Sequence, residues 1–252
     1  MTTAQELRSA FERQRAGFAA APYPTLEERQ AALSALRRAC AFVTPRIARA
    51  LVADFGSHDP HIGLLWELSG VLARIQHASE QLPRWLEPVD RGSEPAGGAR
   101  SYVRYQPKGV IGNMAPWNFP VDISLGPLVD ILAAGNRAIV KPSELAPHCA
   151  ELVRQAVAEN CQPDHVHVVT GGVQLAEVFT RLPWDHLIYT GNPTVARKVL
   201  AAAAENLVPV TLELGGKCPT LIAPDRVNED SLAEVLSIKA VKSGQVCINT
   251  DY

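Results

Sequence analysis

The chain has 252 residues, of which 47% are hydrophobic and 20% charged, with a formal net charge of −2. That length is enough for one large domain or two with a sizeable core. Neither a basic run nor a cationic face stands out, so the charge balance offers no footprint for nucleic acid or an anionic membrane. We therefore expect small-molecule partners, with no nucleic acid and no membrane.

The five cysteines are scattered and include no C-x-x-C pair, which argues against a disulfide framework or a zinc ribbon. The polar N-terminus lacks the apolar core of a signal peptide. His165 and His167 would share one face of a strand, but no third metal ligand accompanies them. We expect a cytoplasmic protein with no metal site.

The first part of the chain predicts helices with clear start signals. Thr3 and Thr25 each precede a glutamate by three residues, the pattern of a capping box. The pairs Thr44-Pro45 and Asp59-Pro60 place a capping side chain before a proline, and each predicts a further helix start. From Pro60 an apolar set recurs at helical spacing and predicts one long core-facing helix: Ile62, Leu65, Trp66, Leu68, Leu72, Ile75, Leu82 and Trp85.

The middle of the chain changes character. Residues 88–100 are rich in turn formers and predict a linker. Residues 101–106 alternate as a half-exposed strand does, and 109–114 follow as a second short strand. We expect these two strands to form a hairpin reaching off the body.

Strands and helices then alternate. Short β-rich runs at 138–140, 166–169, 187–189 and 208–212 are separated by helical stretches that start near Pro120, Pro147, Val173 and Pro193. Such alternation predicts an α/β fold with a parallel sheet covered by helices. A further strand near 219–222 and a helix over 228–243 are expected after it.

Ligands of such sheets collect at the carboxyl ends of the strands. The residues there suit a nucleotide: glycines permit close approach, and a helix near Pro193 would direct free amides at a phosphate. Lys141 could hold ribose hydroxyls, and Glu144 would accept from the 2′-hydroxyl and repel a 2′-phosphate, which favours NAD while leaving NADP possible. The alternative is a surface ion pair of Lys141 and Glu144 with glycines that merely end strands, because no G-x-G-x-x-G or P-loop pattern occurs.

A carboxylate and a thiol stand near the end of the chain. Glu213 precedes a Gly-Gly turn, and Cys247 ends the run Gly-Gln-Val-Cys. This pair is a candidate base and nucleophile for covalent chemistry on a carbonyl. The alternative for Cys247 is an ordinary buried cysteine, and the alternative for Asn118 is a residue that shapes a turn.

Four motifs occur in order along the chain: 116–120 (PWNFP), 141–144 (KPSE), 212–217 (LELGGK) and 244–247 (GQVC). In these motifs the chain resembles the aldehyde dehydrogenase superfamily, and most closely its class-3-like and coniferyl aldehyde dehydrogenase branch. The resemblance implies a Rossmann-like NAD-binding domain with N-terminal helices and a β-hairpin, followed by an α/β catalytic domain. The implied parts are helices at 1–98, oligomerisation strands at 99–115, a nucleotide-binding core at 116–213 and the start of a truncated catalytic domain at 214–252.

The resemblance also implies the roles of individual residues. Cys247 would attack an aldehyde and carry first a thiohemiacetal and then a thioester. Asn118, with the Cys247 amide, would donate to the oxyanion, and Glu213, in a partly dry tunnel, would activate the water that releases the acid. The implied cofactor contacts are Trp117, Lys141, Ser143, Glu144, Gly172, Thr190, Gly191, Asn192, Leu214 and Gly215.

The chain departs from the family pattern in its length and in the turn expected to bind the phosphates, Thr190-Gly191-Asn192. Asn192 stands where a serine is usual, and Ala196 where a glycine is usual. Family members are roughly twice this length, so we expect the N-terminal half of an enzyme that is a homodimer in its full-length parent, and little turnover from these residues alone. Two alternatives remain: an inert remnant that binds nucleotide or a related subunit, and resolution of the thioester by coenzyme A.

Overall fold

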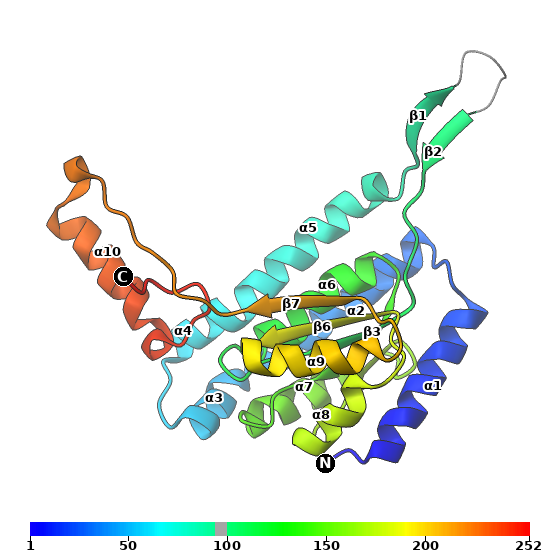
Figure 1. Ribbon diagram of the computed structural model, residues 1–252, viewed down its shortest axis with the longest axis horizontal. Helices are drawn as coiled ribbons and strands as arrows, with labels where there is room; N and C mark the ends of the chain where they lie inside the picture. The colour runs from blue at the N-terminus through cyan, green and yellow to red at the C-terminus, as the bar shows by residue number, and fades with distance from the viewer. Residues whose placement is uncertain (94–99) are drawn as a thin grey trace.

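A computed structural model describes residues 1–93 and 100–252. Five parallel strands form one sheet in the order β5-β4-β3-β6-β7. Figure 1 labels β3, β6 and β7 of this sheet. The chain winds from β3 toward β5 on one side and then returns to add β6 and β7 on the other, so a switch point lies between β3 and β6, where such sheets bind ligands. The α/β prediction is confirmed, with strands β3 (Val110–Met114), β4 (Arg137–Lys141), β5 (Val166–Val168), β6 (His186–Gly191) and β7 (Val210–Leu214).

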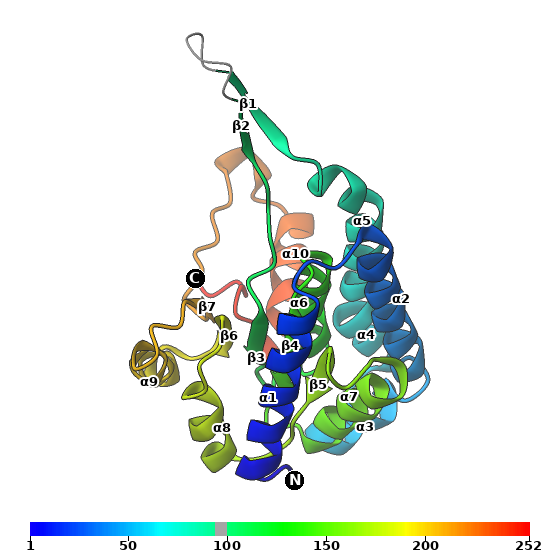
Figure 2. The ribbon, with the colours of Figure 1, turned by 90° about the vertical axis from the view of Figure 1, so that its right-hand side faces the viewer.

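Helices cover both faces of this sheet (Figure 2). On one face α6 (Asp122–Ala133) and α7 (Pro147–Asn160) lie against the strands, and α2 (Leu26–Val43), α3 (Ile47–Phe55) and α5 (Gly70–Trp85) pack over them. The opposite face carries α1 (Ala4–Ala20), α8 (Val173–Thr180) and α9 (Pro193–Ala204). Side chains alternate along a strand, so Ala138 and Val140 enter the first core while Ile139 enters the second.

Three of the four predicted helix starts in the N-terminal part are confirmed. Thr3 and Thr25 form complete capping boxes, and Asp59 caps α4 (Pro60–Leu64) by accepting from two backbone amides. The fourth start is displaced: α3 begins at Ile47, with Arg46 rather than Thr44 as its N-cap. The backbone of Thr44 is helical and its hydroxyl donates to the carbonyl of Cys40 at 2.9 Å, so Thr44 closes α2, whereas an N-cap needs an extended backbone.

The long helix expected from Pro60 is interrupted. A π-helical turn, Leu65–Ser69, separates α4 from α5. A π turn inserts an extra residue and rotates the helix faces relative to one another. The expected apolar face is therefore only partly buried: Leu68, Ile75 and Leu82 are buried, while Ile62, Leu65, Trp66 and Trp85 are exposed.

The hairpin exists, but between different strands from those expected. β1 (Val89–Ser93) pairs antiparallel with β2 (Arg100–Val103), and this arm projects from the body (Figure 1). The expected partner, residues 109–114, instead contains β3, the central strand of the main sheet, whose five residues are all buried. A strand buried on both faces cannot serve as an exposed arm. Of the predicted linker at 88–100, residues 94–99 lie outside the described part.

The segment after β7 is irregular. The strand expected near 219–222 does not form, and a single bridge joins Cys218 to Thr250. A short 3-10 turn, Pro224–Arg226, precedes α10 (Glu229–Ala240), and a second one, Val241–Gly244, follows it. No helix within residues 1–93 and 100–252 has the length and apolarity to cross a membrane.

Candidate active site

Strand register aligns the predicted site residues along one edge of the sheet. Met114 at the end of β3 pairs with Lys141 of β4 on one side and with Tyr189 of β6 on the other. Thr190 in turn pairs with Glu213 of β7. The carboxyl ends of four strands therefore meet at the switch point, and the loop with Trp117 and Asn118 follows β3 there.

One contact brings the predicted oxyanion donor to the loop of the predicted nucleophile. The side-chain amide of Asn118 donates to the carbonyl of Gln245 at 2.8 Å, two residues before Cys247. Cys247 is exposed, and its carbonyl lies 3.7 Å from the Cys218 sulfur. Glu213 is also exposed, and within the described ranges it shares no hydrogen bond with Asn118 or Cys247.

Asn249 organises the nucleophile loop and was not predicted as a site residue. Its side chain is 2% exposed, donates to the carbonyl of Gly244 at 3.1 Å and accepts from the amide of Thr250 at 2.9 Å. Gly244 has a φ of +78°, a conformation that favours glycine. A turn glycine and a buried amide thus fix the backbone on both sides of Cys247.

The other cysteines differ from Cys247 in their surroundings. Burial raises the pKa of the Cys40 thiol to about 12 and that of Cys161 to about 11. Burial also raises the pKa of Cys149, which the nearby Asp54 carboxylate raises further. A thiol must ionise to act as a nucleophile, so exposure makes Cys247 a better candidate than these three.

The edge of the sheet where the strands end, here called the nucleotide edge, contains an ion pair. Lys141 is 3% exposed, and its ammonium lies 3.1 Å from a carboxylate oxygen of Glu144. Burial tends to raise the pKa of Glu144, but a backbone hydrogen bond and Lys141 outweigh it, so that pKa lies below its ordinary value. Ser143 accepts from the amide of Leu145 at 3.2 Å and shapes the turn between them.

The glycines of this edge differ in what they leave open. A methyl group at Gly215 would meet nothing within 4 Å, and one at Gly172 would meet only a glutamine side chain at 3.6 Å. At Gly191 it would come within 2.2 Å of the Tyr189 hydroxyl, so a larger residue there would displace the tyrosine ring. A buried cation, a carboxylate and open backbone at two glycines together suit a dinucleotide.

The phosphate turn at the start of α9 is partly occupied by its own cap. The Asn192 side chain accepts from the amide of Val195 at 2.9 Å, which uses one of the amides expected for a phosphate. Ala196 is buried, so its methyl group packs inward. Trp117 is half-buried beside Phe55, with ring centroids 6.4 Å apart.

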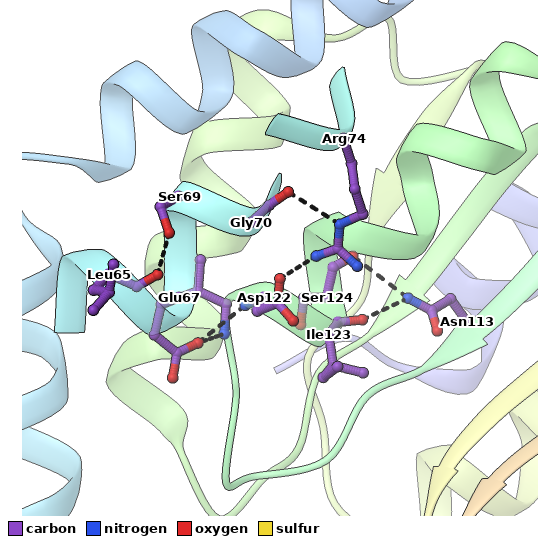
Figure 3. A network of polar contacts seen from close by, with 10 residues as sticks. Leu65, Glu67, Ser69, Gly70, Arg74, Asn113, Asp122, Ile123 and Ser124 are labelled. Atoms are coloured by element: carbon purple, nitrogen blue, oxygen red, sulfur yellow. Dashed lines mark hydrogen bonds and ion pairs between the residues drawn. The ribbon is translucent and has the colours of Figure 1, made fainter. Parts of the chain in front are cut away.

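A buried acid that sequence reasoning missed supports the end of the loop that contains Asn118. Glu67, in the π turn, is fully buried and accepts from the amides of Val121 and Asp122 at 2.9 and 3.0 Å. Figure 3 shows Glu67 beside Asp122. The other carboxylate oxygen of Glu67 pairs with Lys242. Glu67 stands four residues before buried Val71, and an acid on an apolar helix face was the signal from which a buried carboxylate could have been predicted. The sequence around Lys242 carries no comparable signal.

Burial raises the pKa of the neighbouring Asp122, against the pull of Arg74, with which Asp122 pairs. No three His, Cys, Asp or Glu side chains gather as a metal would require in the ranges that the structure describes.

Known proteins resemble this chain in sequence and in fold. A coniferyl aldehyde dehydrogenase from a Pseudomonas species is 38% identical over 252 residues, which are 99% of this chain and 52% of the relative. The substrate-bound structure of Staphylococcus aureus AldH matches with a TM-score of 0.91 at 29% identity, covering 100% of this chain and 54% of that one. A Mycobacterium tuberculosis aldehyde dehydrogenase complexed with NAD+ matches with a TM-score of 0.86 at 26% identity, covering 99% and 52%.

The chain spans about half the length of the curated relatives it matches. The resemblance drawn from the four sequence motifs is confirmed, including the branch with coniferyl aldehyde dehydrogenases. A model of the aldehyde dehydrogenase family matches residues 1–252, and the chain therefore belongs to that family.

Proposed function

We propose that the protein oxidises an aldehyde to a carboxylic acid through a covalent adduct on Cys247, with a nicotinamide dinucleotide as hydride acceptor. The observation that carries the proposal is the contact of the Asn118 side-chain amide with the carbonyl of Gln245. It holds a neutral donor beside the loop of an exposed thiol. An amide so placed can stabilise negative charge on an oxygen attached to a carbon under attack.

The chain's residues divide this chemistry between them. The Cys247 thiolate attacks the aldehyde carbon, and the carbonyl oxygen takes up negative charge facing the Asn118 amide and the backbone amide of Cys247. After oxidation the acyl group remains on the sulfur as a thioester. Glu213, near the carboxyl end of β7, takes a proton from the water molecule that hydrolyses the thioester and releases the acid.

The dinucleotide would be held by the edge of the sheet and, when bound, supplies the acceptor for the hydride. Lys141, Ser143 and Glu144 would meet one ribose, and Gly172, Thr190, Gly191 and Asn192 would lie along the phosphates. Trp117, Leu214 and Gly215 would line the path toward Cys247. The Glu144 carboxylate favours NAD over NADP because a 2′-phosphate would be repelled.

The names of the relatives bear on the substrate. Three curated relatives are named coniferyl or probable coniferyl aldehyde dehydrogenases, so we propose a bulky aromatic aldehyde. By the same family resemblance we propose a cytoplasmic enzyme that is a homodimer as a complete protein, with its β1–β2 arm in the interface.

Replacement of the nucleophile tests the proposal. In the complete natural chain that carries these residues, Cys247→Ser should lower aldehyde-dependent NADH formation by at least about 10³-fold, as loss of a covalent nucleophile does. Cys161→Ser is the matched control and should keep its rate, because Cys161 is half-buried with a raised pKa. NADH formation at the original rate by Cys247→Ser would overturn the assignment.

Glu213 is tested by what accumulates. Glu213→Gln should leave an acyl group on Cys247, detected by mass spectrometry as adduct on the peptide that contains it, since hydrolysis loses its base. Rapid release of that adduct by coenzyme A in the unsubstituted protein, with no hydrolysis in its absence, would favour an acylating enzyme instead.

A further inference from the structure

The ammonium group of Lys242 lies between the nucleophile segment and the loop after β3. It pairs with Glu67, donates to the backbone carbonyl of Asn118 at 2.6 Å and stands 4.0 Å from the centre of the Phe119 ring. The Lys242 side chain is only 7% exposed and that of Glu67 is fully buried. Lys242 itself stands in the turn Val241–Gly244, five positions before Cys247.

The Glu67 carboxylate is held in place by hydrogen bonds as well as by the charge of Lys242. One carboxylate oxygen of Glu67 accepts from two amides at the start of α6, Val121 and Asp122, where the helix dipole favours a negative group. The other oxygen is left for Lys242. A buried charge pair holds one geometry only when its remaining hydrogen-bonding positions are satisfied, and this carboxylate meets that condition.

The backbone at Lys242 indicates that the contact determines the turn. Lys242 and Ser243 both have positive φ, at +48° and +54°, in the left-handed region that residues with a side chain seldom adopt. Two successive residues of this kind persist where surrounding contacts outweigh the local preference. In this turn, the buried ion pair and the bond to the Asn118 carbonyl are those contacts.

We infer that Lys242 is a positioning residue for the oxyanion donor. Its ammonium fixes the main chain of Asn118, while the carbonyl of Gln245 fixes the side-chain amide of the same residue at 2.8 Å. Both fixing groups come from the segment that leads into Cys247, so donor and nucleophile are held as one unit. The inference rests on the proposed function, because it gives Asn118 a role in the reaction.

The first test compares Lys242→Met with Lys242→Arg in the complete natural chain. Misplacement of a reacting group by about 1 Å can cost up to about 100-fold in rate, so we expect Lys242→Met to lower kcat by about 10-fold to 100-fold. The KM for NAD should change less than about twofold, because the Lys141 edge is untouched. Lys242→Arg should be faster than Lys242→Met, since a guanidinium keeps the charge that pairs with Glu67 and has N–H groups to donate to the same carbonyl.

Lys242→Met leaves the Glu67 charge buried alone and can therefore unfold the protein. The double variant Glu67→Gln/Lys242→Met removes both charges and controls for this. With its fold verified by circular dichroism, it should remain as slow as expected for Lys242→Met, because the bond to the Asn118 carbonyl is still missing. A folded double variant with the original kcat would overturn the inference.

A double-mutant comparison with Asn118→Ala asks whether Lys242 acts through Asn118. In the Asn118→Ala background, Lys242→Met should slow the reaction by less than about twofold further, because the group it positions is already gone. The same 10-fold to 100-fold loss in both backgrounds would show an independent structural effect and contradict the inference.

Hydrogen exchange separates failure of this inference from failure of the proposed function. The peptide that contains residues 115–121 should exchange at least about 10-fold faster in the Glu67→Gln/Lys242→Met variant than in the unsubstituted chain, whatever reaction the protein catalyses. Unchanged exchange would overturn the positioning role even if Cys247→Ser is inactive. If this peptide exchanges faster in the double variant but Cys247→Ser is still active, the contact of Lys242 with the Asn118 loop stands and the proposed chemistry is rejected.

Discussion

Two helices of equal length show how differently the two sides of the site are held. Both α6 and α10 have 12 residues; eight of those in α6 are buried, and none in α10 is. Apolar burial holds the sheet and its helices together. The segment of residues 215–252 contacts the body through polar groups, with Lys242 paired to Glu67 and Asn118 bonded to Gln245. Its own turns are held by hydrogen bonds of Asn249 and Asp251.

The difference bears on how the site is assembled. The nucleotide edge stands on strand ends whose register is set by two packed cores, so its geometry depends on the whole body. The Cys247 thiol lies in the segment of residues 215–252, and its position depends on single hydrogen bonds such as that from Asn118 to Gln245. We therefore expect nucleotide binding to resist substitutions in residues 215–252 that alter the reactivity of Cys247.

The largest contrast should come from two leucines, one in each helix. Leu128 of α6 is fully buried, whereas Leu236 of α10 is 58% exposed. Leu128→Ala should lower the free energy of unfolding by about 3 kcal/mol, because it removes apolar contacts and leaves a cavity. In the 252-residue chain, Leu236→Ala should change it by less than about 0.5 kcal/mol. Urea denaturation followed by circular dichroism measures both.

Equal losses at the two leucines would contradict the comparison. That result would mean that α10 is packed against something in solution, and concentration dependence of the Leu236→Ala effect would identify self-association as the cause.

Two glycines give a second, smaller contrast. A methyl group at Gly112 in β3 would lie 2.8 Å from Leu187 and 2.9 Å from Trp184, whereas one at Gly216 would meet nothing within 4 Å. Gly112→Ala should therefore cost about 2 kcal/mol of unfolding free energy through overpacking. Gly216→Ala, at a position without positive φ, should stay within a few tenths of a kcal/mol or stabilise slightly. Thermal melting of both variants decides, and a destabilised Gly216→Ala would show that this turn is packed.

The sheet was predictable because its signals are local. β4, β5 and β6 are short β-rich runs that are each followed by a helix, and this alternation predicts a parallel sheet. The hairpin was paired wrongly because alternation along 101–106 predicts a strand but not its partner. Pairing β2 with β1 and placing β3 centrally depend on burial over long sequence distances, which no local pattern carries.

The site divides in the same way. Lys141 and Glu144 stand three residues apart, and their pairing could be expected from spacing. Glu67 and Lys242 are 175 residues apart, and their contact depends on a π turn that periodicity does not predict. Gln245 as the partner of Asn118 was equally hidden, because a backbone carbonyl gives no sequence signal.

The smallest contrast concerns acids near helix starts in the two regions. Asp54 of α3 is shielded from solvent and accepts from the amides of His148 and Cys149, at 3.0 and 2.8 Å, at the start of α7. Burial tends to raise its pKa, but those hydrogen bonds outweigh it, and the pKa lies below its ordinary value. Asp230 in the first turn of α10 is exposed and serves as the matched control.

A pKa lower in the folded than in the unfolded chain means that the unfolded chain binds more protons. The stability that Asp54 contributes is therefore complete above about pH 5 and is lost as pH falls through about 4 toward its folded pKa. Asp54→Ala should cost about 1 kcal/mol at pH 7, typical of a lost helix cap, and less near pH 3. Asp230→Ala should cost a few tenths of a kcal/mol at pH 7. Urea denaturation at both pH values measures this, and a cost for Asp54→Ala that is the same at pH 3 and pH 7 would mean that the carboxylate charge contributes nothing to the cap.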